Sequence, residues 1–444
     1  MKRDLLTGNP SKVLLSFAIP IFLSTVFQQL YTIADSLIAG KFAGEDALAA
    51  IGASYPVTMI FMAVSIGSNT GCSVIISQLF GGSRIKDMKT AVSTALITLF
   101  ALSAVITVAA LAFSPQIMTF MNTPKNIFGD ADLYFKIYIG GFTFLSLYNI
   151  ANGVFTALGD SKTPLYFLII SSVVNVILDY VFVAEFEWGV AGAAWATFIS
   201  QGAACITAVA VIIIKLKKIP SERFEFFSFP MLRNLTRVSS QTILQQSFIS
   251  VGNMLVQGIV NGYGSSVIAG YAAAIKLITF CVTSLHTVAN AMAAFTAQNV
   301  GANQYDRVKK GYRVSIVIVF VLAAVFTVSY VVFGEFFVNM FLESTESTKA
   351  LETGRNFLLI VSLAFCIVSL KVVSDAVTRG AGAIRLFAIS TFADLIIRVA
   401  LSYALAPMLG VNAVAVAWTI GWLIGMVLAV CFYKFGNWKN HKLA

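Results

Sequence analysis

Two aspartates in the first half of the chain occur in segments that are otherwise apolar enough to lie in a lipid bilayer. Asp35 lies in "YTIADSLIAG", and Asp179 ends the stretch "NVILD". Ionisable residues at bilayer depth are rare and by default indicate an ion or proton pathway. These apolar segments contain no Lys or Arg, so two such carboxylates cannot easily both ionise. The pattern therefore predicts a proton or sodium site.

A polar neighbour strengthens this prediction. Asn175 precedes Asp179 by four residues, so on a helix its amide can hydrogen-bond the carboxyl group. Sodium is the nearest alternative to a proton as the bound ion, because carboxylate and amide oxygens are the ligands that a hard cation requires. The alternative is structural, with Asp179 a satisfied residue near the outer end of its helix and Asp35 a charge at the extracellular rim.

The second half of the chain differs because it carries both signs of charge at membrane depth. Asp394 and Arg398 are four residues apart, as are Lys371 and Asp375, which is the spacing of local ion pairs. We expect these four groups to neutralise one another. The alternative is that they form a binding site for a substrate anion. The predicted second-half polar cluster comprises Asn253, Lys276, Lys371, Asp375, Asp394 and Arg398.

Pro20 lies in the same apolar segment as Asp35. A proline inside a helix removes a backbone hydrogen bond and bends the helix. Protonation of Asp35 could therefore cause this helix to bend at Pro20. The alternative is a kink at Pro20 that stays the same whether or not Asp35 is protonated.

The elements that must position these residues are membrane helices. Of the 444 residues, 58% are hydrophobic and 11% are charged, against about 25% charged in soluble proteins. The chain is therefore expected to be an all-α polytopic membrane protein of twelve transmembrane helices. The predicted spans are 13–40, 48–80, 90–113, 132–158, 165–184, 189–214, 231–260, 266–298, 312–334, 351–379, 384–407 and 410–434.

The net charge of +10 reflects topology and gives no reason to expect nucleic acid as a partner. Sorted by alternate loops, 22 Lys and Arg fall on one side, 5 on the other and 3 inside helices. The positive-inside rule then places both termini in the cytoplasm and the protein in the cell membrane, with the lipid bilayer as its surroundings. The five cysteines lack CxxC spacing, and no metal or organic cofactor is expected.

The two halves of the chain are a repeat. "TVFQQLYTIADSLIAGKFAG" matches "TILQQSFISVGNMLVQGIVNG", and the alignment pairs Gln78 with Gln298, Asn175 with Asp394, and Asp179 with Arg398. We predict two pseudo-symmetric lobes, 1–214 with helices 1 to 6 and 231–444 with helices 7 to 12, joined by a cytoplasmic linker, 215–230. A parallel duplication of six helices suits alternating access between two lobes.

From "NPSKVLLSFAIPIFLSTVFQQLYTIADSLIAG" through "TALGDSKTP" to "NVILDY", the sequence resembles the multidrug and toxic compound extrusion (MATE) family, most closely its DinF-like branch. The resemblance implies a monomeric, non-enzymatic antiporter that exports amphipathic, often cationic organic molecules in exchange for H⁺ or Na⁺. It also implies that Pro20 is the bend point of helix 1. By the same resemblance, the cation site comprises Asp35, Asn152, Asn175, Asp179 and Thr197.

Other functions fit the sequence less well. The NorM-like branch of the family carries an acidic residue on helix 7, where this chain has Gln245, Gln246 and Asn253. A flippase for a lipid-linked precursor would need several cations in its cavity, and Lys276, Lys371 and Arg398 keep that alternative open. An intramembrane aspartyl protease would use two facing aspartates, but "ALGD" at 157–160 lacks the first glycine of the GxGD signature.

Overall fold

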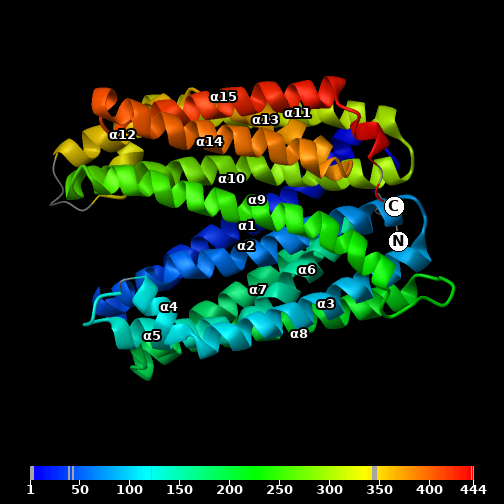
Figure 1. Cartoon of the computed structure of the whole chain (residues 1–444), viewed down its shortest axis with the longest axis horizontal. Helices are drawn as coiled ribbons and strands as arrows, with labels where there is room; N and C mark the ends of the chain where they lie inside the picture. The colour runs from blue at the N-terminus through cyan, green and yellow to red at the C-terminus, as the bar shows by residue number, and fades with distance from the viewer. Residues whose placement is uncertain are drawn as a thin grey trace. The chain divides into compact units, whose positions relative to one another are not determined.

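The chain is helical throughout the part that the structure describes. The computed structural model describes residues 5–38, 41–42, 45–121, 123–342, 348–441 and 443, and within these ranges it contains no strand (Figure 1). The predicted all-α class is therefore confirmed.

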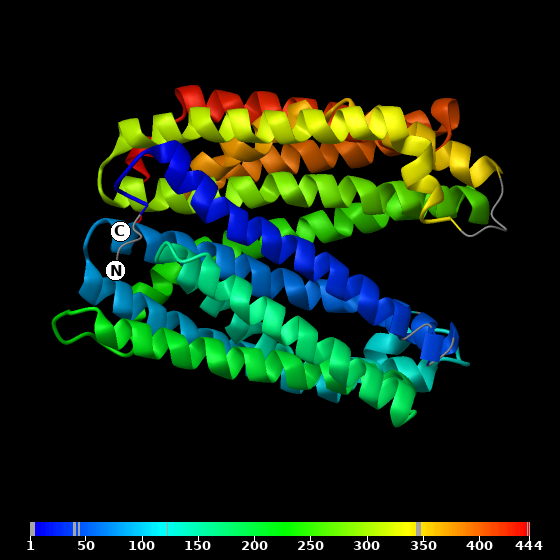
Figure 2. The same ribbon diagram turned by 180° about the vertical axis from the view of Figure 1, so that it is seen from behind.

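The described chain divides into two compact units. The first contains Ile19–Ile243, and the second contains Leu5–Ala18 together with Leu244–Ala444. This division assigns the start of the first helix to the second unit, whereas the repeat in the sequence would assign it to the first lobe. The predicted linker 215–230 comprises the end of one helix, the loop 219–228 and the start of the next helix (the green loop in Figure 2).

The first unit is built from α1 beyond Ala18, from α2 to α8 and from the beginning of α9. Short interruptions split two of the predicted spans: Gly141 separates α5 from α6, and a π-helical turn, Tyr180–Glu185, follows α7. The helices are α1 (Pro10–Ile38), α2 (Glu45–Gly81), α3 (Ile85–Ala112), α4 (Ser114–Phe120), α5 (Phe128–Gly140), α6 (Phe142–Ala157), α7 (Lys162–Asp179), α8 (Gly189–Lys218) and α9 (Phe229–Asn261).

The second unit contains the start of α1, the rest of α9 and six further helices. A bend of 52° separates α12 from α13 within one predicted span. The remaining helices are α10 (Ser265–Gly301), α11 (Tyr305–Asn339), α12 (Thr348–Ser362), α13 (Phe365–Gly380), α14 (Ile384–Leu409) and α15 (Asn412–Phe435).

Length and composition identify the membrane helices. Among the described residues, nine helices are long and apolar enough to cross a membrane, or ten if the bent pair α12 and α13 forms one span. The remaining two predicted spans correspond to the pair α5 and α6, whose members have only 13 and 16 residues, and to α14, which carries Asp394 and Arg398.

The repeat in the sequence is also a repeat in backbone geometry. Ser83 ends the turn after α2 with φ 57°, and the aligned Asn303 ends the turn after α10 with φ 58°. Gly159 and Gly382 likewise have positive φ in the turns after α6 and α13, where glycine adopts the conformation without strain. The two halves therefore fold through the same turns.

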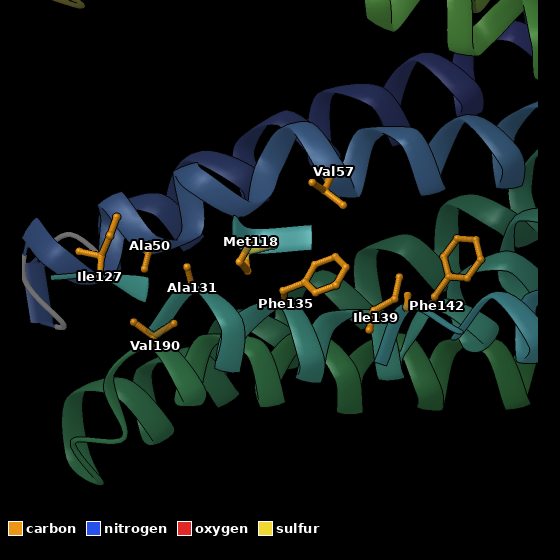
Figure 3. Close-up of a cluster of buried hydrophobic side chains, with 10 residues drawn as sticks. Ala50, Val57, Met118, Ile127, Ala131, Phe135, Ile139, Phe142 and Val190 are labelled. Carbon is orange, nitrogen blue, oxygen red and sulfur yellow. The ribbon is translucent and has the colours of Figure 1, made fainter. Parts of the chain in front are cut away.

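An apolar core positions the helices of the first unit. Phe135 and Ile139 of α5 pack with Phe142 of α6, and Val57 of α2 and Val190 of α8 belong to the same buried cluster (Figure 3). Burial of such side chains contributes roughly 1.5–3 kcal/mol each in water. In a bilayer the gain comes from close packing instead. This core fixes α5 and α8, both of which contribute residues to the candidate site.

Candidate functional site

The structure brings the two aspartates of the first unit together. The carboxyl groups of Asp35 on α1 and Asp179 on α7 lie within hydrogen-bond reach of each other. Asp179 is only 1% exposed, and Asp35 is half-buried. A carboxylate can only accept hydrogen bonds, so a bond between two carboxyl groups requires a proton on one of them. The arrangement can therefore hold a proton between two helices.

Asn175 connects this pair to a third helix. Oriented so that both its polar atoms have partners, the amide donates to Asp179 Oδ2 (3.0 Å) and accepts from the backbone N–H of Thr197 (3.3 Å) on α8. The other carboxylate oxygen, Oδ1 of Asp179, has no hydrogen-bond partner among the described residues. One acceptor of the pair thus stays available to a proton or another cation.

Tyrosines that the sequence analysis missed also surround the pair. The hydroxyl of Tyr31, one turn before Asp35 on α1, lies within hydrogen-bond reach of Thr197. Tyr134 on α5 lies near both carboxyl groups, and its ring stacks on that of Tyr138 at 6.0 Å. The spacing of Tyr31 and Asp35 by four residues was the available signal, because residues four apart share one face of a helix.

A cavity of about 260 Å³, whose lining includes many polar residues, borders this site within the first unit. Asn175 and Tyr31 line this cavity, and so does Asn152 on α6, the remaining residue of the predicted cation site. Its other polar lining residues are Ser24, Thr25, Gln28, Tyr148, Asn149, Thr156, Ser161, Ser171, Ser172, Ser200 and Gln201.

Pro20 lies inside α1, as predicted. The helix continues through it, and the hydroxyl of Ser24 donates to the Pro20 carbonyl at 2.9 Å. The boundary between the two compact units on α1 falls between Ala18 and Ile19. The proline therefore stands one residue beyond the point at which α1 passes from one unit to the other.

The second-unit charges form a buried ion-pair network. Lys371 Nζ lies 3.0 Å from Asp375 Oδ2 and 3.6 Å from Asp394 Oδ2, and Arg398 Nη2 lies 2.9 Å from Asp394 Oδ1. The Trp418 ring stacks on the Arg398 guanidinium at 4.9 Å. Two acids and two bases leave the network neutral, which agrees with the expected mutual neutralisation.

Small residues on α15 make room for this network. A Cβ atom at Gly425 would lie 2.5 Å from Lys371 Cε, and one at Gly421 would lie 2.7 Å from Asp394 Oδ1. Both distances are shorter than a van der Waals contact, so α15 approaches the charged side chains with its backbone.

Two members of the predicted second-half cluster do not belong to it. Asn253 lies on an exposed face of α9, and the exposed Lys276 stacks over the Phe341 ring at 5.4 Å. Sequence position indicated their depth in the membrane but not which way their helices face, and neither residue contacts the ion-pair network.

Asp160, the acid of "ALGD", lies in the turn between α6 and α7. It accepts hydrogen bonds from the Thr163 hydroxyl (2.6 Å) and the Thr163 backbone N–H (3.0 Å), and it forms an ion pair with Lys215. Burial disfavours the charged form, but the bonds from Lys215 and Thr163 outweigh burial and hold the pKa of Asp160 below its ordinary value of 3.8. The carboxylate thus pins the turn to α8.

The two halves of the chain match one and the same family. A model of the MatE family matches residues 20–181 and again residues 242–404. The chain belongs to the MatE family. The predicted family and the predicted class of secondary exporter are confirmed, and the assignment to the DinF-like branch stays a prediction.

Curated relatives of this MatE protein span nearly its whole length. It is 28% identical to the probable multidrug resistance protein YpnP of Bacillus subtilis over 99% of the chain and 98% of the relative. It is 23% identical to an FAD transporter of Shewanella oneidensis, with coverage of 82% and 81%. It is 24% identical to the multidrug export protein MepA of Staphylococcus aureus, with coverage of 73% of each chain.

Solved structures establish the fold of this MatE protein. A MOP superfamily transporter from Pyrococcus furiosus superposes with a TM-score of 0.90 at 21% identity, covering 97% of this chain and 96% of the other. A MATE transporter from Vibrio cholerae superposes with a TM-score of 0.88 at 17% identity, covering 96% of each chain. These likenesses confirm the twelve-helix fold that the sequence predicted.

Proposed function

We propose that this MatE protein exports amphipathic, often cationic organic molecules and takes up protons in exchange. The observation that carries the proposal is the contact between Asp35 and Asp179, two carboxyl groups on different helices with no base in contact with either among the described residues. The names of YpnP and MepA as multidrug proteins support a broad range of organic substrates.

The exchange follows from the charge of the pair. When both carboxyl groups are deprotonated, the first unit carries negative charge that attracts a cationic substrate. A proton bound between Asp35 and Asp179 removes that attraction and draws α1 toward α7. Because the proton binds one arrangement of α1 better than another, it shifts the population toward the state that releases substrate. Pro20 is the place where α1 bends as this occurs.

A proton suits this pair better than sodium. A hydrogen bond between the two carboxyl groups is an interaction of the protonated pair. Sodium would instead have to separate the two groups and collect several oxygen ligands around itself. Asn175 and Thr197 could supply such ligands, so the choice of ion is decided by experiment.

A flippase for a lipid-linked precursor is less well supported. Lys371 and Arg398 are each paired with buried acids, and Lys276 lies apart from both of them. Cations already neutralised by the protein have little attraction left for a pyrophosphate.

The expected setting is the cell membrane, with both termini cytoplasmic and the protein acting as a monomer. The basic residues of the loops support this orientation through the positive-inside rule. A cysteine scan of the loops with an impermeant reagent tests the orientation.

Purified protein in liposomes tests the coupling. We expect efflux of ethidium, a fluorescent organic cation, to be driven by an imposed proton gradient and not by a sodium gradient of equal size. Efflux driven by sodium alone would replace the proton with sodium in this mechanism. Efflux under neither gradient would contradict antiport at this site.

A further inference from the structure

The linker between α8 and α9 carries a group of exposed phenylalanines that the transport mechanism does not use (the green loop in Figure 2). We propose that this segment is a docking surface for the membrane itself. Its phenylalanines enter the lipid at the membrane surface, and its basic residues bind the headgroups of anionic phospholipids. The inference goes beyond the proposed function and takes from it only the expectation that the linker lies on the cytoplasmic side.

The phenylalanines form an apolar patch. Four of them lie within six residues of the linker, in the stretch "FEFFSF" that ends at Phe229. Phe226 and Phe229 are 74% and 76% exposed. Phe224 lies deeper: Lys89 Nζ of α3 lies 5.6 Å from the centre of its ring, which contacts the ring of Phe226 at 5.3 Å. An exposed apolar patch marks a surface that meets another protein or a membrane. The linker is therefore a candidate docking surface.

Hydrogen bonds hold the linker along the side of α3. Lys89 Nζ donates to the Ile219 carbonyl at 2.7 Å, and the backbone N–H of Ser228 donates to Thr94 Oγ1 at 3.2 Å. Thr94 lies nine residues beyond the start of α3, which is about 14 Å at a rise of 1.5 Å per residue. The linker therefore folds back beside α3, and its contacts fix the direction in which the phenylalanines project.

This side of α3 is the one that faces lipid. Ser93 Oγ donates to the Glu225 carbonyl at 3.3 Å. Ile97 and Phe100, four and seven residues further on, share that face of α3, and both are exposed. The helices α3, α8 and α9 are each long and apolar enough to cross a membrane, so an exposed apolar face on them is a lipid-facing one. The linker therefore lies where the lipid-facing surface of α3 meets the membrane boundary.

The charge of the segment selects the kind of lipid. Residues 216–237 contain five bases and two acids, a net charge of +3. The bases are all exposed, and none forms an ion pair in the part of the chain that the structure describes. Basic residues beside a membrane helix attract anionic lipids, and phenylalanine with lysine and arginine is typical of segments at the membrane interface. The five bases are Lys217, Lys218, Arg223, Arg233 and Arg237.

The depth of the linker in the membrane is the first test. A nitroxide label is attached to Phe226→Cys in a variant without the five native cysteines, in vesicles of phosphatidylcholine and phosphatidylglycerol. We expect this label to collide mainly with oxygen, which dissolves in lipid, and a label at the exposed Ser221→Cys to collide mainly with a water-soluble nickel complex. Phe229→Cys repeats the measurement at a second position. Labels at Phe226→Cys and Phe229→Cys as open to water as the one at Ser221→Cys would overturn the proposal.

Selection of the headgroup is the second test. A fluorophore at Phe229→Cys is quenched by lipids with a nitroxide on the acyl chain, either anionic phosphatidylglycerol or zwitterionic phosphatidylcholine. One basic residue near an anionic surface favours binding by roughly fivefold. Phosphatidylglycerol should therefore quench at a concentration lower by roughly fivefold or more.

The combined variant Lys217→Gln, Lys218→Gln and Arg223→Gln should lose this preference. Lys217→Arg with Lys218→Arg keeps the charge and should retain it. Equal quenching by the two lipids with the linker otherwise unaltered would overturn the selection of anionic lipid. Neither measurement depends on transport, so a failure of the coupling mechanism would leave both results unchanged.

Discussion

Asn175 donates its side-chain amide to Asp179, four residues further along α7, at 3.0 Å. The repeat places Asp394 and Arg398 at the equivalent positions of α14, where Arg398 donates to Asp394 at 2.9 Å. The contact joins equivalent positions in the two helices, but the donor comes before the acid along α7 and after the acid along α14. In the first unit the acid is left with an amide as its partner, and in the second unit the acid is neutralised by a base. This difference supports the proposal that the first unit couples the ion and that the charges of the second unit are structural.

Replacement of Asn175 by Leu tests the amide contact. The variant keeps a similar volume but removes the donor to Asp179, and a hydrogen bond to a charged group contributes roughly 1.5–3 kcal/mol. We expect proton-driven efflux to fall by roughly tenfold or more. Asn149→Leu is the control, because Asn149 lines the same cavity but donates to Leu145 O. Equal losses of efflux in the two variants would mean that transport depends on the lining of the cavity and not on the contact between Asn175 and Asp179.

Replacement of Pro20 by Ala tests the hinge. The variant restores a helical hydrogen bond in α1, and a proline in a helix interior costs about 3 kcal/mol or more. Thermal stability in detergent should therefore hold or rise while efflux falls several-fold. Pro56→Ala, in the interior of α2, should change stability in the same direction without the loss of efflux. Undiminished efflux by Pro20→Ala would leave the proline as a static kink.

Replacement of Lys371 by Met tests the second-unit network. Removing one partner leaves Asp375 and Asp394 with a single base, and breaking a buried ion pair typically costs about 3–5 kcal/mol. We expect a clear loss of thermal stability, partly recovered in the neutral double variant Lys371→Met with Asp375→Leu. Lys276→Met, on an exposed side chain, should stay within about 0.5 kcal/mol of the wild type. A stable, inactive Lys371→Met protein would move this cluster from structure to transport.

Replacement of Asp160 by Asn tests the pinned turn through its pH dependence. The pKa of Asp160 lies below its ordinary value of 3.8, so its ion pair stabilises the folded state at neutral pH. That stabilisation is complete above 3.8 and is lost as the pH falls through the lower folded-state value. For a partly exposed pair we expect about 0.2–1 kcal/mol. The difference in the free energy of unfolding between wild type and Asp160→Asn should become smaller at acid pH. A difference that is constant with pH would exclude the charge as its cause.

Periodicity and composition were enough to predict the helices, because a bilayer admits few other structures. The breaks at Gly141 and between α12 and α13 were not predicted, since both lie inside continuous apolar runs. Asp35, Asn175 and Asp179 could be found because polar residues are conspicuous in apolar segments. Tyr31 could have been found from its spacing of four residues from Asp35. Tyr134 could not, because tyrosine is common in membrane helices and only packing shows that Tyr134 lies near the carboxyl pair.

Helical phase explains why two similar lysines have different surroundings. Lys276 and Lys371 look alike in the sequence, yet Lys371 contacts Asp375 and Asp394 whereas Lys276 contacts Phe341. The spacing of Lys371 and Asp375 carries that information, because residues four apart meet on one helix. Lys276 has no acid at such a spacing, and its surroundings depend on contacts between helices.

Asp179→Asn is the most direct test of the central claim. The variant keeps the shape of the side chain but cannot bind and release a proton, and ethidium efflux is measured in proteoliposomes under an imposed proton gradient. We predict that efflux driven by the gradient is lost although the protein remains folded and still binds ethidium. Wild-type efflux by Asp179→Asn would show that Asp179 is structural, and the account of coupling through the first unit would be wrong.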